Sequence, residues 1–415
     1  MKRILFLALK VLWYSAAALA PVSCFEAVKA SGGNAPAPET QRAEEAERDA
    51  EKAEAEKEAE AAEAALWARA LSLARSLDDR QLAAQVLMAG TDGKEKLPPW
   101  MREIFSEVPP GALMLFSYNI ADSPGAVASF IAEAKEFVAG ESLVPFIAVD
   151  HEGGAVNRLA GVAGSFPPPL FYGDEALKKG VQAALDEVYG SALSAAAELG
   201  GLSITMNLAP VAEVLTGDNS AFLGDRSYGR DASFTGGAAS LFVLAMKEKG
   251  VASALKHFPG HGATDPHEGR TVLPYAAGEL RALVSSFRTV IERAAPAALI
   301  VSHAAVPAMD GEPSASLSPA VMRSWIREEL GFEGIILTDD FSMKAVRSLF
   351  PSTGEASVAA LNAGADMVMV WPPDILKTHR AFLAALAEGR LSRERLEEAS
   401  ARIIREKLRY GLLDE

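Results

Sequence analysis

The feature that most constrains the fold is a repeated alternation between short apolar runs and longer amphipathic segments. Short apolar runs bounded by turn residues are typical of buried strands, and helical periodicity is typical of helices packed on one face. The eight apolar runs are Gln85–Gly90, Gly111–Phe116, Val144–Asp150, Ile204–Val211, Val251–His257, Ala297–His303, Gly334–Asp340 and Asp366–Trp371. The helical segments between them include Ala126–Phe137, Val181–Leu199, Gly236–Lys249 and Glu279–Ala294. This alternation predicts an α/β fold with a parallel sheet.

Eight strand–helix units favour a closed (β/α)8 TIM-type barrel over an open sheet. A last helical segment, Arg393–Leu408, follows the eighth unit. The 415-residue chain is 49% hydrophobic, which is ample for the core of one such barrel. We therefore expect a single catalytic domain over residues 67–415.

The first 24 residues have the layout of a secretory signal, with a basic start followed by an apolar run. Small residues permit cleavage near Ala20, and Pro21-Val22-Ser23-Cys24 resembles a bacterial lipoprotein cleavage box with Cys24 as the lipid-bearing residue. The prediction is an exported protein of the cell envelope, either periplasmic or anchored to the membrane through Cys24. Cys24 is the one cysteine, so an intrachain disulfide is excluded.

Residues 25–66 are expected to be a linker and a helical stalk. The stretch from Ser31 to Thr40 is rich in Gly, Pro and Ala, as flexible linkers are. Residues 41–66 are almost entirely Ala and charged residues, which form helices but here lack an apolar stripe. Because the chain carries a net charge of −15, we expect no nucleic-acid partner.

Polar residues follow several of the predicted strands, where barrels place their catalytic groups. Asp150-His151-Glu152-Gly153-Gly154 leads to Arg158, and these groups suit recognition of a hydroxyl-rich ligand. An Asp150–Arg158 bridge that merely closes the turn is the structural alternative. The pair Asp339-Asp340 should point to opposite sides, with one carboxylate at the barrel mouth as a nucleophile for a glycosidic carbon. Capping of the next helix is the alternative for this pair.

The third polar stretch, residues 256–267, holds three of the six histidines. Lys256 and His257 should end a strand, and the Pro- and Gly-containing remainder should be a loop. Histidine is the side chain best suited to proton transfer near neutral pH, and a carboxylate two residues away could orient it. His261 is left as a loop-shaping residue.

Together these stretches resemble the β-N-acetylhexosaminidases of glycoside hydrolase family 3. The family pattern is Asp-Gln-Glu-Gly-Gly-x-Val-x-Arg, then Lys-His-Phe-Pro-Gly-His-Gly followed by Asp-Ser-His, then Ser-Asp-Asp-Leu-Ser-Met. This chain has Asp150–Arg158, an intact Lys256–Gly262 run and Thr338–Met343 in the same order. The resemblance spans roughly residues 75–410.

The resemblance implies a role for each matching residue. Asp339 would be the nucleophile that forms a covalent glycosyl intermediate, and His267 the general acid/base, polarised by Asp265. Residues gripping the terminal sugar would be Asp150, Arg158, Arg226, Lys256 and His257. The implied reaction is retaining exo-hydrolysis of a terminal β-linked N-acetylhexosamine, from peptidoglycan fragments or chitooligosaccharides. No cofactor and no metal are implied, and a monomer is expected.

Two departures from the family pattern stand out. His151 replaces the usual Gln. Only Ala263 and Thr264 separate Gly-His-Gly from Asp265, where the family has four residues, and Pro266 replaces the serine. We therefore expect a shorter and stiffer loop, with an effect on rate or substrate preference.

Three alternatives remain open from the sequence. A metal-dependent barrel hydrolase would use His257, His261, His267, His303 and Asp339 as ligands, although Pro259-Gly260 prevents the helical spacing of a His-x-x-x-His pair. A catalytically impaired sugar-binding lipoprotein would have lost activity through the shortened loop. A phosphorylase would transfer the glycosyl group to phosphate instead of water.

Overall fold

The computed structural model describes residues 38–311 and 313–414. The predicted signal segment, Cys24 and most of the linker lie outside these residues. The chain divides into two compact units, residues 1–65 and 66–415. In the described part of the first unit, helix α2 (Pro38–Ser76) begins, and its side chains from residue 50 to 65 are almost all exposed. No helix among the described residues is long and apolar enough to cross a membrane.

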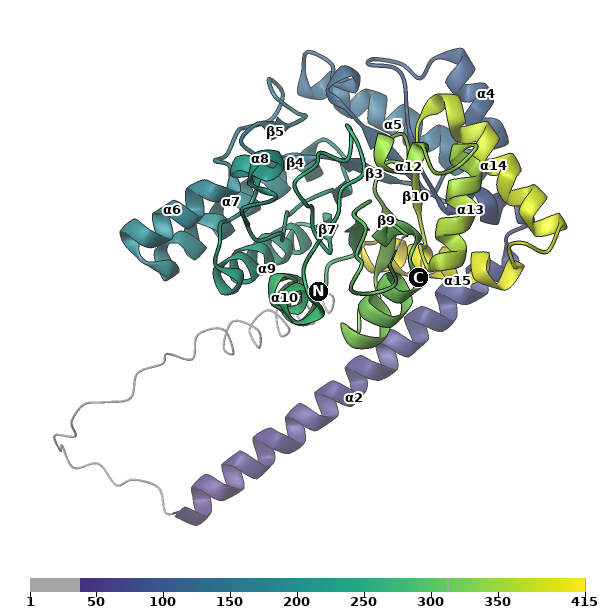
Figure 1. Cartoon of the computed structure of the whole chain (residues 1–415). Helices are drawn as coiled ribbons and strands as arrows, with labels where there is room; N and C mark the ends of the chain where they lie inside the picture. Colours follow the sequence, from purple (N-terminus) through teal and green to yellow (C-terminus); the bar gives the residue numbers. More distant parts are fainter. Residues whose placement is uncertain (1–37, 312, 415) are drawn as a thin grey trace. The chain divides into compact units, whose positions relative to one another are not determined.

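The second unit is built on a barrel of eight parallel strands (Figure 1). The strands are β1 (Leu87–Gly90), β2 (Ala112–Leu115), β3 (Phe146–Val149), β6 (Met206–Asn207), β7 (Ala252–Phe258), β8 (Ala298–Val301), β9 (Ile335–Thr338) and β10 (Val368–Val370). Their order is β10-β1-β2-β3-β6-β7-β8-β9. A parallel bridge between Leu337 and Met367 brings β9 beside β10 and nearly completes the ring. Each predicted run contains one strand, which confirms the (β/α)8 prediction.

Helices connect the strands. They are α3 (Asp79–Gln85), α4 (Pro99–Glu107), α5 (Pro124–Glu141), α6 (Pro169–Lys179), α7 (Val181–Gly201), α8 (Ser220–Leu223), α9 (Ala232–Glu248), α10 (Ala277–Leu283), α11 (Ser285–Ala294), α12 (Lys344–Arg347), α13 (Thr353–Ala363), α14 (Pro372–Ala387) and α15 (Arg393–Arg409). Short 3-10 turns lie at Ser117–Asn119, Gly224–Arg226 and Ala315–Leu317, and a π-helix spans Ala320–Glu329. A hairpin of β4 (His151–Gly153) and β5 (Val156–Asn157) follows β3. The single helix predicted over Glu279–Ala294 is interrupted at Val284, so that expectation is corrected to two helices.

The core lies in the barrel and between the strands and the surrounding helices. Phe258 at the end of β7 is fully buried and packs edge-on against Phe287 of α11, with ring centroids 5.4 Å apart. The ring of Trp325, on the π-helix, lies 4.9 Å from Phe258 on another side. Burial of large aromatic side chains contributes strongly to stability. These contacts hold the end of β7, which carries part of the site, against two helices.

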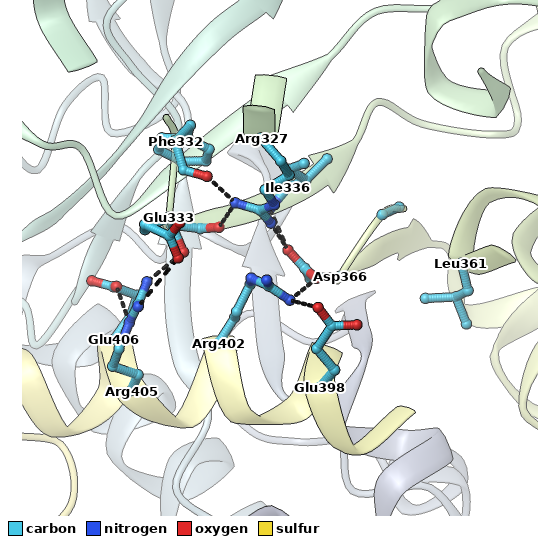
Figure 2. Close-up of polar contacts among 12 residues, drawn as sticks. Arg327, Phe332, Glu333, Ile336, Leu361, Asp366, Glu398, Arg402, Arg405 and Glu406 are labelled. Carbon is cyan, nitrogen blue, oxygen red and sulfur yellow. Dashed lines mark hydrogen bonds and ion pairs between the residues drawn. The ribbon is translucent and has the colours of Figure 1, made fainter. Parts of the chain in front are cut away.

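A buried ionic network joins α15 to the barrel wall (Figure 2). The carboxylate of Asp366 is completely buried and pairs with Arg327, with Arg395 at 2.9 Å and with Arg402 at 3.6 Å. It also accepts a hydrogen bond from the backbone N–H of Ile336 in β9 at 2.9 Å. Three guanidinium groups share one carboxylate, so the network depends on the charge of Asp366.

Candidate active site

The predicted polar residues gather at the carboxyl ends of the parallel strands. Asp150 directly follows β3, Lys256 and His257 lie in β7, and Asp339 directly follows β9. Because all eight strands are parallel, these positions share one edge of the barrel. This is the edge at which barrels build their active sites.

A group of four charged side chains joins β3 to β7. The Lys256 ammonium donates to Asp150 Oδ1 at 2.7 Å and lies 2.5 Å from Glu152 Oε1. The Arg226 guanidinium donates two hydrogen bonds to Glu152, from Nε and from Nη2, both at 2.9 Å. Such forked pairing fixes orientation as well as distance. The sequence singled out Asp150, Lys256 and Arg226 but gave Glu152 no role, and Glu152 is the residue that links them.

Electrostatics keep this group ionised although it is buried. Burial alone would raise the pKa of Glu152, but Lys256 and Arg226 lower it to about 2. Burial would lower the pKa of Lys256, but Asp150 and Glu152 raise it above its usual value. Two acids and two bases therefore balance, and each charge has a partner, as buried charges require. The group offers fixed donors and acceptors to a ligand with several hydroxyl groups.

Arg158 lies next to this group and is less buried. Its Nε is 3.9 Å from Asp150 Oδ2, and its side chain is 34% exposed. The guanidinium carbon lies 5.7 Å from the centroid of the Phe116 ring, within the range of a cation–π contact. Arg158 is therefore near Asp150 without closing the tight structural bridge that the sequence left as an alternative.

A second buried group centres on Glu213, which follows β6. The carboxylate accepts hydrogen bonds from His257 Nδ1 at 2.7 Å, His261 Nδ1 at 3.0 Å and the backbone N–H of His261 at 2.7 Å. Burial would raise the pKa of Glu213, but His261 and His257 lower it well below its usual range. Because an ionised carboxylate only accepts hydrogen bonds, both imidazoles carry their proton on Nδ1 in this arrangement. Their Nε2 atoms are then acceptors.

Glu213, His257 and His261 are also the one group of potential metal ligands that comes together among the described residues. To bind a metal through these atoms, both Nδ1 positions would have to lose the protons that they donate to Glu213. The metal set expected as an alternative from the sequence is not assembled: His303 bonds Ser316 and the backbone oxygen of Asp340, and His267 bonds Asp265. The hydrogen bonds account for the Glu213 group without an ion.

The two adjacent acids after β9 have different partners. Asp339 Oδ1 accepts the backbone N–H of Asp340 at 2.9 Å. Burial would raise the pKa of Asp339, but His257 and His303 lower it, so the carboxylate is ionised. The Asp340 carboxylate accepts hydrogen bonds from Ser342 and from the indole Nε1 of Trp371. Asp339 is thus the acid that faces the histidines, and Asp340 holds the wall of the mouth.

Asp265 and His267 form a pair on the loop after β7. His267 Nδ1 lies 2.8 Å from Asp265 Oδ1, and the same oxygen accepts the backbone N–H of His267 at 2.8 Å. The His267 side chain is 60% exposed and that of Asp265 is 39% exposed. A hydrogen bond from the N–H of Ala345 to the carbonyl oxygen of Pro266, at 3.1 Å, ties this loop to the segment after Asp339. Among the described contacts, His267 has none with Asp339.

The structure thus brings the sequence-predicted residues into three sets. Lys256 bridges to Asp150, with Arg226 and Arg158 close by; His257 lies against Glu213 near Asp339; and Asp265 with His267 forms a separate exposed pair. Glu152 and Glu213 were missed as functional candidates. The available signal was their position directly after predicted strands, in Asp150-His151-Glu152 and in Val211-Ala212-Glu213.

A (β/α)8 barrel with an ionised carboxylate, a histidine–aspartate pair and a paired-charge pocket at its carboxyl edge defines a hydrolase-type barrel site for a polar substrate. The family model "Glycosyl hydrolase family 3 N terminal domain" matches residues 82–406. The chain belongs to this family.

Relatives with known names agree with this assignment. The chain is 29% identical over 334 residues to Beta-hexosaminidase A of Pseudoalteromonas piscicida, covering 74% of this chain and 54% of that protein. It is 35% identical over 281 residues to Beta-hexosaminidase of Methylococcus capsulatus, covering 65% and 78%. A solved glycoside hydrolase family 3 β-N-acetylglucosaminidase from Paenibacillus matches with a TM-score of 0.76 and 31% identity, covering 81% of this chain and 63% of that one. The chain therefore spans only about half to two thirds of the first and last of these relatives.

Proposed function

We propose that the protein is a retaining exo-β-N-acetylhexosaminidase that hydrolyses a terminal, non-reducing, β-linked N-acetylhexosamine. The observation that carries the proposal is the buried, ionised Asp339 on the barrel edge shared with Asp150, Lys256 and His257. The similarity to named β-hexosaminidases supports the same activity. Peptidoglycan fragments or chitooligosaccharides are the substrates that fit this linkage.

In the proposed mechanism, the hydroxyl groups of the terminal sugar bind Asp150, Arg158, Arg226, Lys256 and His257. The Asp339 carboxylate attacks C1 while the bond from C1 to the glycosidic oxygen breaks. His267 Nε2 gives its proton to that oxygen as the leaving group departs. Asp265, bonded to Nδ1, orients the ring and stabilises its protonated form. Water then attacks C1, returns a proton to His267 and releases Asp339, so the anomeric configuration is retained.

The exposed position of His267 gives the loop a specific part in this mechanism. Its side chain is the most exposed of the proposed catalytic groups, and Pro266 restricts the backbone beside it. We infer that substrate completes the site by covering this pair, since catalytic hydrogen bonds often tighten only in the complex. The tie between Pro266 and Ala345 limits how far the loop can travel.

The test is release of 4-nitrophenol from 4-nitrophenyl N-acetyl-β-glucosaminide. We expect kcat of Asp339→Asn to fall by about 10³-fold or more, since it loses the nucleophile, and kcat of His267→Ala to fall by about 10²-fold or more, since it loses the proton donor. Wild-type turnover by Asp339→Asn would reject the nucleophile assignment. Stoichiometric zinc together with loss of activity in chelator would favour the metal-dependent alternative, and a requirement for phosphate would favour a phosphorylase.

The envelope location and the division of the chain belong to the same proposal. The N-terminal sequence supports export with cleavage near Ala20 or lipidation of Cys24. In this arrangement residues 25–66 separate the catalytic unit, residues 67–415, from the membrane-proximal end. A carbohydrate is the proposed substrate, and a monomer suffices because all the proposed site residues lie in one chain.

A further inference from the structure

Three aromatic side chains meet at the barrel mouth, on strands that none of the sugar-gripping residues occupies. Phe116 directly follows β2 and Trp371 directly follows β10, while Tyr118 lies two residues beyond Phe116. The rings of Phe116 and Tyr118 are nearly parallel, 9° apart, with centroids 5.9 Å apart. The ring of Trp371 meets Phe116 edge-on at 4.7 Å. We call these three residues the aromatic wall.

The aromatic wall is held in place by polar contacts on both sides. Asn119 is fully buried; its side chain accepts the backbone N–H of Phe116 at 2.9 Å and donates to the carbonyl oxygens of Thr91 and Gly93 at 2.9 and 2.8 Å. The indole N–H of Trp371 donates to Asp340, the neighbour of Asp339. The wall is therefore preorganised, which reduces the ordering cost of binding a ligand.

Gly90 at the end of β1 makes room for the wall. A Cβ atom at this position would lie 2.2 Å from Cε3 of Trp371, closer than any real side chain allows. The indole thus lies directly on the backbone of the first strand. This close approach requires glycine, and it places Trp371 between Asp340 and Phe116.

The wall connects the two functional parts of the mouth. Phe116 lies under the Arg158 guanidinium, which is proposed to grip the terminal sugar, and Trp371 bonds the residue beside the proposed nucleophile. Tyr118 extends the wall away from both; it is 53% exposed, and its described ring contact is with Phe116 alone. A sugar held by Asp150, Lys256 and Arg158 uses charged partners, so the exposed aromatic face beyond it is free for the next unit.

We propose that Phe116, Tyr118 and Trp371 form a stacking surface for the second sugar of the substrate, the leaving group, with Tyr118 as its outermost contact. The inference rests on the proposed function and names the part of the substrate that this surface selects. A pyranose has an apolar face of C–H groups, which packs on an aromatic ring while the hydroxyl edge remains hydrated. The protein then prefers disaccharides and longer oligosaccharides over glycosides with a small leaving group.

The test compares two ligands with the same terminal sugar, N,N′-diacetylchitobiose and methyl N-acetyl-β-glucosaminide. Binding is measured by calorimetry in the Asp339→Asn background, so that turnover does not interfere. We expect Tyr118→Ala to weaken the Kd of the disaccharide about five- to tenfold, the value of one lost aromatic contact. The Kd of the methyl glycoside should change by less than twofold. Tyr118→Phe is the matched control and should bind both ligands like the parent.

Equal weakening of both ligands would overturn the proposal, because the wall would then serve the terminal sugar. No change for either ligand, or no binding of the disaccharide by the parent, would also overturn it. Turnover of both substrates by the otherwise wild-type chain is measured in parallel. If the disaccharide binds with the expected Tyr118 dependence but neither substrate is cleaved, the stacking surface stands and the proposed hydrolase activity fails.

Discussion

At the scale of single residues, Glu213 carries a function that its position in the sequence does not announce. It follows β6 and receives three hydrogen bonds, two of them from the imidazoles of His257 and His261. The burial and ionisation of this carboxylate set the tautomer of both rings. His257 therefore offers Nε2 as an acceptor on the side of the ring away from Glu213.

We predict that Glu213→Gln lowers kcat/KM about 10- to 100-fold, comparable with the loss of an outer partner that orients a functional histidine. The amide has one acceptor oxygen and a donor that opposes an Nδ1–H, so it cannot satisfy both rings. The measurement is steady-state kinetics with the nitrophenyl substrate over a range of pH. Glu213→Asp keeps the charge and is the control; if it loses as much as Glu213→Gln, then reach rather than charge is what matters.

At the scale of secondary-structure elements, α15 is attached to the barrel wall by charge. Arg395 and Arg402 of α15 and Arg327 of the π-helix converge on Asp366, and Arg405 of α15 bonds the backbone oxygen of Glu333 (Figure 2). Burial would raise the pKa of Asp366, but the surrounding arginines lower it, so the carboxylate is ionised.

We predict that Asp366→Asn lowers the free energy of unfolding by about 3–5 kcal/mol, because it leaves buried guanidinium groups without a counter-charge. Chemical denaturation monitored by circular dichroism measures this. The control is Glu107→Gln, which removes an exposed pair with Arg380 and should change stability by about 0.5 kcal/mol or less. Similar values for the two variants would show that Asp366 contributes no more than a surface pair.

Sequence patterns predicted the elements better than their contacts. Each apolar run contained a strand because a strand buried on both faces has a continuous apolar sequence. The break at Val284 was missed because the periodicity continues through it. Glu152 and Glu213 were missed because their roles depend on partners about 45 to 105 residues away, Arg226 and Lys256 for one and His257 and His261 for the other. Such partners are identified only when the strands are placed side by side.

At the scale of the whole molecule, the catalytic unit can be delimited by its packing. Residues 50–65 of α2 are mostly exposed, whereas Ala70 and Ala74 are fully buried. The ring of Trp67 lies 5.6 Å from the guanidinium carbons of Arg402 and of Arg405. The last part of α2 therefore belongs to the folded body around α15.

We predict that a variant beginning at Leu66 unfolds at a free energy within about 0.5 kcal/mol of the full chain, because the residues removed bury little surface. A variant beginning at Asp78 should lose several kcal/mol, since it also lacks Trp67 and the buried alanines. Thermal and chemical denaturation of both variants measure the difference. Equal stability of the two would place the boundary after α2 instead of within it.

The contact between Gly90 and Trp371 has a consequence for how the site is assembled. Gly90 ends the first strand of the barrel and Trp371 follows the last, and β1 pairs directly with β10 across about 280 residues of sequence. The aromatic wall thus stands on the seam where the two ends of the barrel meet. The charged pocket, by contrast, is contained between β3 and β7. No fragment that lacks either the first or the last strand contains the whole wall, so this part of the mouth exists only once the ring of strands has come together.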